Sequence, residues 1–557
     1  MPMPRSPWLI AAGLLAISTA VNLAVWAWLG APHVMPAGPS SLTQKLDCVS
    51  YTPFQADGSP FEGLAPIDPK LIAADVLRLA PITKCLRTYS AVGHSLSEVA
   101  AEAERQELTV LQGAWISRDA IANQAEITEA AAIAKAHPKT VTALVVGNEV
   151  LLRNEQTPAG LVALINQAKD ISGLPVTYAD VWEFWLKNPS VADAVDFITI
   201  HILPFWEDDP VAAADASRHV AGIYGRVSAA FPGRRIVIGE VGWPSAGRMR
   251  EAALPSPANQ ARVLHDVVAM ARAKGITANI IEAFDQPWKR RLEGAVGGHW
   301  GLFDAYARAP KFTWASAVSN HPCWKSQAAG SIIFSALILL FCARVARRRP
   351  DPSQSVPAHA WAGAGVIATI APLLASFSVE PLIAGAFGAT GIARACMLGS
   401  VALAAPFVAV GVVAGARTPS LAQMIGPKDI RAKCPLSRAM GIIFIATILA
   451  AIQVALSLTF DPRYWDFPFA ILTAAALAFA VLALRPISTA RTTSGVAEKM
   501  CASVLGSCAV VIVLNEGLSN WQAVWLALAL TSLALTLWLT PGVHNPDAPT
   551  PKGSARS

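Results

Sequence analysis

Two stretches of the sequence share one design, in which a strand-like apolar run stops at a glycine and a glutamate follows. Residues 234–245 read RRIVIGEVGWPS, and the glutamate there is Glu240. Residues 142–150 read TALVVGNEV, and the glutamate there is Glu149. Runs of this kind are typical of strands buried on both faces of a sheet. A carboxylate at the end of such a strand is costly to bury unless it faces a cleft or pairs with a base.

Two such strand ends suggest two carboxylates that converge at one rim of a parallel sheet. Parallel (β/α) barrels keep their chemistry at the rim where the strands end. Glycoside cleavage requires a pair of carboxylates, because one acid protonates the leaving oxygen while the other attacks the sugar or directs water. For each glutamate taken alone, the alternative is a structural acid paired with a nearby base.

Eight strand-like runs between Lys45 and about Lys311 predict an α/β domain. Helix-like segments separate several of them, and both Pro158–Ile171 and Pro257–Lys274 open on a proline, which suits a first helical turn. This alternation fits a (β/α)8 TIM barrel, which needs about 250 residues, so we expect the barrel over residues 45–320. The predicted strands are Cys48–Phe54, Cys85–Ser90, Leu108–Ile116, Ala143–Glu149, Pro175–Val181, Phe197–Leu203, Arg235–Gly242 and Ala278–Phe284.

The composition shows that part of the chain lies in lipid. Only 15% of the 557 residues are charged, whereas soluble domains hold about 25%. Trp8–Leu29 is uncharged and long enough to span a bilayer, so we expect an N-terminal anchor over residues 1–30 and a Pro-, Gly- and Ser-rich linker over 31–44. A cleaved signal peptide is the alternative. The segment is long for one, however, and Trp26 and Trp28 are placed like interfacial anchors.

After the barrel, the sequence predicts an all-α, polytopic membrane domain over residues 326–540, followed by a disordered cytoplasmic tail over 541–557. The spans hold few polar residues, Gln453 among them, and no pair of intramembrane charges that would mark a charged transport path. The seven predicted spans, of which Met500–Leu514 is the shortest, are Ser326–Ala343, Ala358–Val379, Ala395–Ala416, Ala439–Phe460, Phe467–Leu484, Met500–Leu514 and Leu518–Leu539.

Positive charges sort the loops between these spans. By the positive-inside rule they place both termini in the cytoplasm and the barrel on the outer side of the membrane. The formal net charge is only +6, and basic residues do not form blocks with interleaved aromatics, so nucleic acid is not an expected partner. The residues of the positive loops are Arg344, Arg347, Arg348, Arg349, Arg417, Lys428, Arg431, Lys433, Arg438, Arg485, Arg491 and Lys499.

The eight cysteines are too few and too scattered for a disulfide framework or a zinc site. Cys48 and Cys85 each open a predicted strand, and their sulfurs would meet if those strands are neighbours. A disulfide between them is plausible outside the cytoplasm. We expect neither a metal nor a cofactor.

Four motifs resemble those of glycoside hydrolase family 17, which contains β-1,3-glucanases and glucanosyltransferases on a (β/α)8 barrel. They are VVGNEV at 145–150, IVIGEVGWPS at 236–245, IIEAFDQPWK at 280–289 and HWGLFD at 299–304. The resemblance covers about Cys48–Trp314. The layout with membrane anchors resembles that of bacterial members that are β-1,3/β-1,6-glucan synthases or transglycosylases. It implies a multi-pass protein of the bacterial inner membrane with a periplasmic barrel.

The resemblance implies a retaining mechanism and roles for three residues. Glu149 matches the general acid/base, Glu240 the nucleophile, and Asn148 the asparagine that hydrogen-bonds the sugar 2-OH. Lys289 matches a lysine near the acceptor side. The chain departs from the family pattern at Gln286, where a glutamate is common.

Further residues at predicted strand ends are candidates for sugar binding, each with a packing role as the alternative. The phenol of Tyr51 is expected to hydrogen-bond the nucleophile, and Tyr178, His201 and Glu282 are site or barrel-support residues. Sugars present apolar C–H faces to aromatic rings. The tryptophans expected to build subsites on this ground are Trp115, Trp182, Trp206, Trp243 and Trp288.

Three functions remain open on the sequence. The first is a membrane-anchored transglycosylase that elongates β-1,3-glucan or adds β-1,6 links. The second is an endo-β-1,3-glucanase with the same residues, and the third is a polysaccharide transport or binding protein. The membrane domain is a platform in the simplest case. Otherwise it handles glucan or docks other glucan synthesis or export components.

Overall fold

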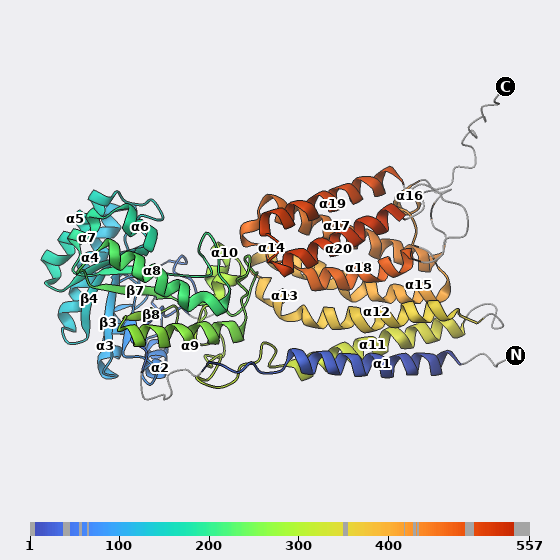
Figure 1. Ribbon diagram of the computed structural model, residues 1–557, viewed down its shortest axis with the longest axis horizontal. Coiled ribbons are helices and arrows are strands. Elements are labelled where there is room, and N and C mark those ends of the chain that lie inside the picture. Colours follow the sequence, from blue (N-terminus) through green and yellow to red (C-terminus); the bar gives the residue numbers. More distant parts are fainter. Residues whose placement is uncertain are drawn as a thin grey trace, which may run out of the picture. The chain divides into compact units, whose positions relative to one another are not determined.

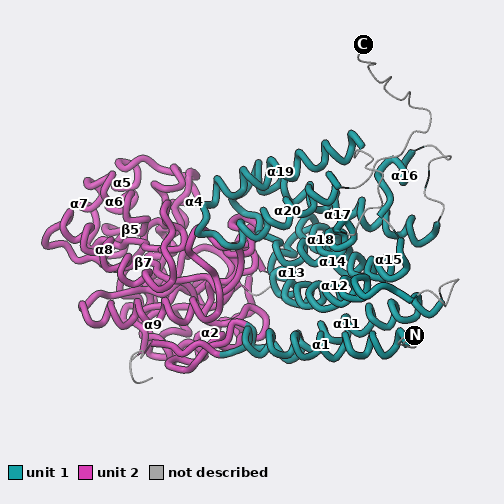
Figure 2. The backbone as a smooth tube through the Cα atoms, turned by 45° about the vertical axis from the view of Figure 1, so that its right-hand side comes forward, with its two compact units in different colours: residues 1–31, 321–557 teal, residues 32–320 magenta. Residues whose placement is uncertain are grey.

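The computed structural model describes residues 6–36, 45–54, 58–63, 66–348, 355–416, 418–426, 431, 434–484 and 495–539. It divides into two compact units (Figure 2), Pro32–Asn320 and a helical unit made of Met1–Ala31 with His321–Ser557. Most of the expected linker and the expected tail 541–557 lie outside the described residues. So do Arg349, Arg417, Lys428, Lys433, Arg485 and Arg491 of the predicted positive loops.

The first unit is a closed barrel of eight parallel strands in sequence order, which confirms the fold prediction. β1 closes the barrel by pairing with β8, with Cys48 opposite Asn279. The strands are β1 (Cys48–Ser50), β2 (Cys85–Arg87), β3 (Thr109–Ala114), β4 (Val141–Asn148), β5 (Val176–Val181), β6 (Ile198–His201), β7 (Ile236–Val241) and β8 (Ala278–Ile280). Figure 1 labels β3, β4, β7 and β8.

The helices between the strands begin where the sequence places start signals. α5 begins at Pro158 behind Thr157, whose hydroxyl accepts the Gly160 N–H, and α9 begins at Pro257 behind Ser256. Side-chain caps of this kind satisfy backbone donors that the first turn leaves unpaired. The barrel helices are α2 (Pro69–Leu79), α3 (Ser97–Arg105), α4 (Ala120–Ala136), α5 (Pro158–Ser172), α6 (Trp182–Lys187), α7 (Ser190–Ala194), α8 (Ala216–Ala230), α9 (Pro257–Lys274) and α10 (Arg290–Glu293).

Seven of the eight strands end earlier than the sequence predicts, and only β5 ends at the predicted residue, Val181. The predicted strand Ala278–Phe284 stops at Ile280, and the residues after it also pair with a later segment of the chain. Glu282 donates its N–H to Trp300 and accepts the Leu302 N–H, while Phe284 bridges to Phe303. β1 likewise ends at Ser50, so Tyr51 and Glu282 lie just beyond their strands, at the rim.

A disulfide joins Cys48 to Cys85, as anticipated if their strands were neighbours. These are the first residues of β1 and β2, which pair side by side. The bond therefore lies at the end of the barrel opposite to the rim where the strands finish.

The helical unit contains seven helices long and apolar enough to cross a membrane, counted over the described residues, and one shorter apolar helix. The predicted span Met500–Leu514 lies within the longer helix α19, Val496–Glu516, whereas the predicted span Phe467–Leu484 corresponds to the shorter helix α18. The helices are α1 (Pro7–Leu29), α11 (Trp324–Arg347), α12 (Ala358–Phe377), α13 (Val379–Gly385), α14 (Gly388–Ala404), α15 (Ala409–Ala414), α16 (Leu421–Ile425), α17 (Pro435–Phe460), α18 (Phe469–Ala483), α19 (Val496–Glu516) and α20 (Trp521–Leu539).

Candidate active site

Glu240 lies within β7 and is almost fully buried, with 5% of its side chain exposed. One of its carboxylate oxygens contacts Arg87 Nη1 at 2.6 Å and accepts the hydroxyl of Tyr89 at 2.9 Å. The glycine before it is required for space. A Cβ on Gly239 would lie 2.4 Å from Thr199 Cγ2.

Burial alone would raise the pKa of Glu240. The charges of His201 and Arg87, together with the hydrogen bond from Arg87, outweigh burial and hold that pKa below its ordinary value. The pKa of Tyr89 moves the other way, because burial and then the charge of Glu240 raise it well above its usual range. Tyr89 therefore stays a hydrogen-bond donor, and Glu240 stays an ionised acceptor.

Sequence reasoning missed Arg87 and Tyr89. They come from CLRTYS, two residues apart, and a strand places such residues on one face. A fully buried arginine in a strand was the available signal, because it needs a carboxylate partner. Arg87 also donates to Asn148 Oδ1 at 2.5 Å and so ties the nucleophile candidate to the residue before Glu149.

Glu149 lies one residue beyond β4, and its environment is different. Its backbone has a φ of 54°, in the left-handed region that is strained for a side chain other than glycine. Gly147 precedes it with a φ of 85°, so the chain turns sharply where β4 ends. The turn carries the side chain to the rim, where 23% of it remains exposed.

His201, the last residue of β6, bridges the two glutamates. Its Nδ1 lies 3.0 Å from Glu149 Oε1, and its Nε2 lies 3.7 Å from Glu240 Oε1. An oxygen of Glu149 and an oxygen of Glu240 come within 4.8 Å of each other and of His201. The structure thus brings together the three residues that the sequence placed on three different strands.

Three such donors could in principle hold a metal ion. Here each already has a partner of another kind. Arg87 supplies a fixed cation at 2.6 Å from the Glu240 oxygen, and His201 is hydrogen-bonded to Glu149. A divalent ion at this position would have to compete with the guanidinium, so the arrangement suits proton transfer and nucleophilic attack better than metal binding.

The loop after Glu149 is fixed from both sides. On the β5 side, Tyr178 accepts the Leu151 N–H at 2.9 Å and donates to Asp180, so Tyr178 supports the loop. Burial raises the pKa of Asp180 to about 6, against the opposing hydrogen bond from Tyr178 and with a further upward contribution from Glu149.

On the β3 side, Arg153 forms the other support. Its guanidinium donates to the carbonyl of Asn148 and to that of Ile116 at 3.1 Å, and it lies over the ring of Trp115 at 4.4 Å. Trp115 is 36% exposed at this rim, so one face of the indole is held by Arg153 and the rest is available.

The expectation for Tyr51 is wrong in its geometry. Its hydroxyl hydrogen-bonds Asp75 at 3.2 Å, and Asp75 in turn pairs with Arg308 at 2.6 Å. The phenol that contacts Glu240 is that of Tyr89, two residues beyond the adjacent strand β2. Tyr51 and Tyr89 follow neighbouring strands, and they differ in the direction in which their side chains point.

Glu282 and Lys289 form a buried ion pair at 2.7 Å near the carboxylates. Burial raises the pKa of Glu282 to about 7, although Lys289 opposes that shift. Glu293 on α10 faces the same region. Burial raises its pKa, Lys289 opposes the shift, and the charges of Glu149 and Glu240 add to it.

The tryptophans named from the sequence divide into buried and rim positions. Trp243 is fully buried and donates to the Leu254 carbonyl, so the expectation that it binds sugar is wrong. Trp182 donates to Glu207, and Trp206 stacks on Trp300 with ring centroids 6.4 Å apart. Trp288 meets Phe61 edge-on and donates to Gln286, the position that departs from the family pattern.

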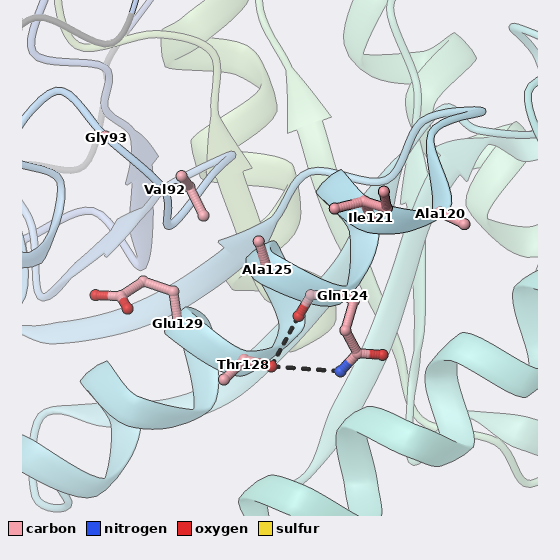
Figure 3. A pocket seen from close by; sticks show the side chains of 8 residues that line it. All are labelled: Val92, Gly93, Ala120, Ile121, Gln124, Ala125, Thr128 and Glu129. Carbon is pink, nitrogen blue, oxygen red and sulfur yellow. Dashed lines mark hydrogen bonds between the residues drawn. The ribbon is translucent and has the colours of Figure 1, made fainter.

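A surface hollow lies elsewhere on the barrel (Figure 3), between α4 and the loop after β2. None of its lining residues is among the partners of Glu149 and Glu240 described above. Its lining residues are Val92, Gly93, Ala120, Ile121, Gln124, Ala125, Thr128 and Glu129.

Comparison with known proteins finds relatives of the barrel unit. Residues 48–301 match the BtgE/BtgC glycoside hydrolase domain. A glucan 1,3-beta-glucosidase of Saccharomyces cerevisiae is 26% identical over 251 residues, which make up 40% of this chain and 79% of that protein. A probable beta-glucosidase btgE of Aspergillus clavatus is 27% identical over 279 residues, and the chain spans about half of its length, 47%.

A solved structure, the glycoside hydrolase family 17 beta-1,3-glucanosyltransferase from Rhizomucor miehei, is 26% identical with a TM-score of 0.42. The match covers 48% of this chain and 97% of that one. The family match confirms the enzyme prediction at the level of a glycoside hydrolase domain, and it lies wholly within the barrel unit Pro32–Asn320.

Proposed function

We propose that this chain is a membrane-anchored, retaining transglycosylase that acts on β-1,3-glucan. The carrying observation is the pair of carboxylates, with an oxygen of Glu149 within 4.8 Å of an oxygen of Glu240. Retaining glycosidases hold their carboxyl groups about 5–5.5 Å apart, whereas inverting ones leave about 6.5–9.5 Å for a water. The names of the relatives, glucan 1,3-beta-glucosidases, support β-1,3-glucan as the substrate.

In the first step, Glu240 attacks the anomeric carbon of the donor sugar and Glu149 protonates the glycosidic oxygen. The bond to the leaving chain breaks as the bond to Glu240 forms. The lowered pKa of Glu240 suits this role, because Arg87 and Tyr89 keep the carboxylate ionised without solvent. His201 would orient the carboxyl group of Glu149 through its Nδ1.

In the second step, Glu149 acts as the base. It removes a proton from an acceptor hydroxyl, which attacks the glycosyl-enzyme and releases Glu240. A sugar hydroxyl at this point gives a longer glucan, a sugar 6-OH gives a β-1,6 link, and water gives hydrolysis. Bound aromatic platforms favour the sugar, because they raise its effective concentration above that of competing water. Trp115 beside Arg153 is one such platform.

A plain β-1,3-glucanase is the second candidate, and the names of the relatives favour it. The two functions share every step up to the glycosyl-enzyme. Incubating the purified full-length protein with millimolar laminari-oligosaccharides distinguishes them by product size and linkage. Products longer than the substrate, or carrying new β-1,6 links, are expected. If only shorter β-1,3 products form, the protein is a hydrolase.

A glycan-binding or transport role predicts a different result. Binding alone needs neither an acid nor a nucleophile, so a Glu240→Gln protein would keep full cellular activity under that hypothesis. We expect it to lose that activity.

We also propose that the barrel lies outside the cytoplasm of a bacterial cell, anchored in the inner membrane with both termini inside. The positive loops support this orientation, and the disulfide between Cys48 and Cys85 is compatible with an oxidising compartment. A phosphatase reporter after Thr313 should be active, and one near Arg349 should be silent. The reverse pattern would place the barrel in the cytoplasm.

A further inference from the structure

The N-terminal helix α1 carries three polar or indole side chains on one stripe, four residues apart. Ser18, Asn22 and Trp26 are each 0% exposed, although this helix is apolar enough to cross a membrane. Figures 1 and 2 both show α1 lying along α11 in the helical unit. A buried polar group inside such a unit is costly unless a partner satisfies it.

α11 carries a matching stripe with the same spacing, Gln327, Ser331 and Ser335, and all three are at least nine-tenths buried. Ser18 donates to Ser335 Oγ at 3.1 Å, which fixes the register of the two antiparallel helices. Each further step is four residues on both helices. The register therefore sets Asn22 opposite Ser331 and Trp26 opposite Gln327.

One end of this stripe is closed by hydrogen bonds, and α12 takes part. Ser18 also bonds the carbonyl of Ala368, and Asn22 Nδ2 donates to the carbonyl of Ser18 and, at 3.5 Å, to that of Thr369. Nearer the ends that lead to the barrel, Ser376 donates to the Gln327 carbonyl, which brings α12 against the same stripe.

The other end leaves buried polar atoms without partners among the described residues. These atoms are Asn22 Oδ1, Trp26 Nε1 and both amide atoms of Gln327. The donors are the indole of Trp26 and the amide nitrogen of Gln327, and the acceptors are the amide oxygens of Asn22 and Gln327. Exchanging the amide nitrogen and oxygen of Gln327 would not satisfy it, because both atoms are unpaired.

We propose that Asn22, Trp26 and Gln327 line a buried water-binding site between α1, α11 and α12. Water supplies what these atoms require, because it donates to Asn22 Oδ1 and accepts from the indole of Trp26 and the amide of Gln327. Buried waters typically make about three hydrogen bonds to such groups. The site ends at the Ser18–Ser335 bond, about 12 Å along the helix from Trp26. This inference does not depend on the proposed enzymatic function.

The test uses hydroxyl radicals generated from bound water by X-ray irradiation of the full-length protein in lipid nanodiscs. Trp26 is compared with Trp361 on α12, which is slightly more exposed, at 5%, and packs in the apolar core of the same unit. Because radicals form where water is bound, we expect Trp26 to be oxidised at least about threefold faster than Trp361. Oxidation of Trp26 no faster than Trp361 overturns the proposal.

A variant sharpens the result. Asn22→Leu combined with Gln327→Leu removes the polar lining, and Trp26 oxidation should then fall to the rate of Trp361. Thr531→Leu is the control, since among the described residues the Thr531 hydroxyl bonds a carbonyl of its own helix, that of Ala527. It should leave Trp26 oxidation unchanged. Unaltered oxidation of Trp26 in the double variant would contradict the site, and the wild-type comparison stands even if that variant fails to fold.

Discussion

Glu240 and Glu149 follow the same sequence design, yet the structure gives them opposite surroundings. Glu240 stays in its strand, is buried, and has a guanidinium and a phenol on one oxygen. Glu149 lies just beyond its strand in a left-handed backbone conformation, its side chain is 23% exposed, and its carboxylate contacts His201. A nucleophile must stay ionised, whereas an acid/base must exchange a proton with substrate. The difference supports the proposed roles, with Glu240 as the nucleophile and Glu149 as the acid/base.

The largest expected effect comes from removing either carboxylate. Glu149→Ala and Glu240→Ala should each reduce activity by about 10²–10⁴-fold or more, because each removes a reacting group. Azide separates the roles on an activated aryl β-glucoside of laminaribiose. It should give an α-glycosyl azide with Glu240→Ala and a β-glycosyl azide with Glu149→Ala. Exchanged stereochemistry would reverse the assignment.

The next largest effect tests the ionisation of Glu240. Arg87→Met should lower kcat/KM by about 10–100-fold, since hydrogen bonds between charged groups contribute about 1.5–3 kcal/mol. The folded-state pKa of Glu240 is now lowered, so losing the cation should raise it and move the acidic limb of the pH profile to higher pH. Tyr51→Phe is the matched control, because that phenol contacts Asp75. An unmoved acidic limb in Arg87→Met contradicts the model of Glu240.

A smaller effect should follow from loosening the turn that presents Glu149. Arg153→Met removes the guanidinium from the Asn148 and Ile116 carbonyls, and we expect kcat to fall about tenfold with little change in KM, because misplaced groups lose rate rather than affinity. Arg118→Met is the control. Arg118 touches the end of the same loop, at the Asn154 carbonyl, but is exposed. Equal losses in both variants would mean that Arg153 only stabilises the fold.

The smallest effect concerns Glu282, whose pKa is raised by burial more than the charge of Lys289 lowers it. Its folded-state pKa is raised to about 7, above an unfolded value of about 4.3. The folded state thus holds a proton that the unfolded state has lost, and stability should fall as pH rises from about 4.3 to 7. Glu282→Gln should flatten this part of the Tm–pH curve, while Glu129→Gln, an exposed acid on α4, should not. An unchanged slope in Glu282→Gln would show that Glu282 is ionised throughout.

Sequence periodicity by itself determined the barrel, the apolar helices and the rim position of both glutamates. The spacing of apolar residues along a strand or helix shows which of its faces is buried, and this spacing can be read from a short stretch of sequence. The same reasoning failed where direction mattered. Tyr51 and Tyr89 stand at adjacent strand ends, and only the closed sheet aims Tyr89 at Glu240.

Tertiary structure decided what surrounds each charge. Arg87 lies 153 positions from Glu240 in the sequence, and their pairing depends on closure of the barrel, which leaves only β1 and β8 between β2 and β7. Likewise, nothing local marks Gln327 as a partner for α1, which it meets only through the antiparallel register set by Ser18 and Ser335. Local sequence specifies which residues must be buried, but electrostatics depends on distances between residues remote in the chain, and folding alone fixes those.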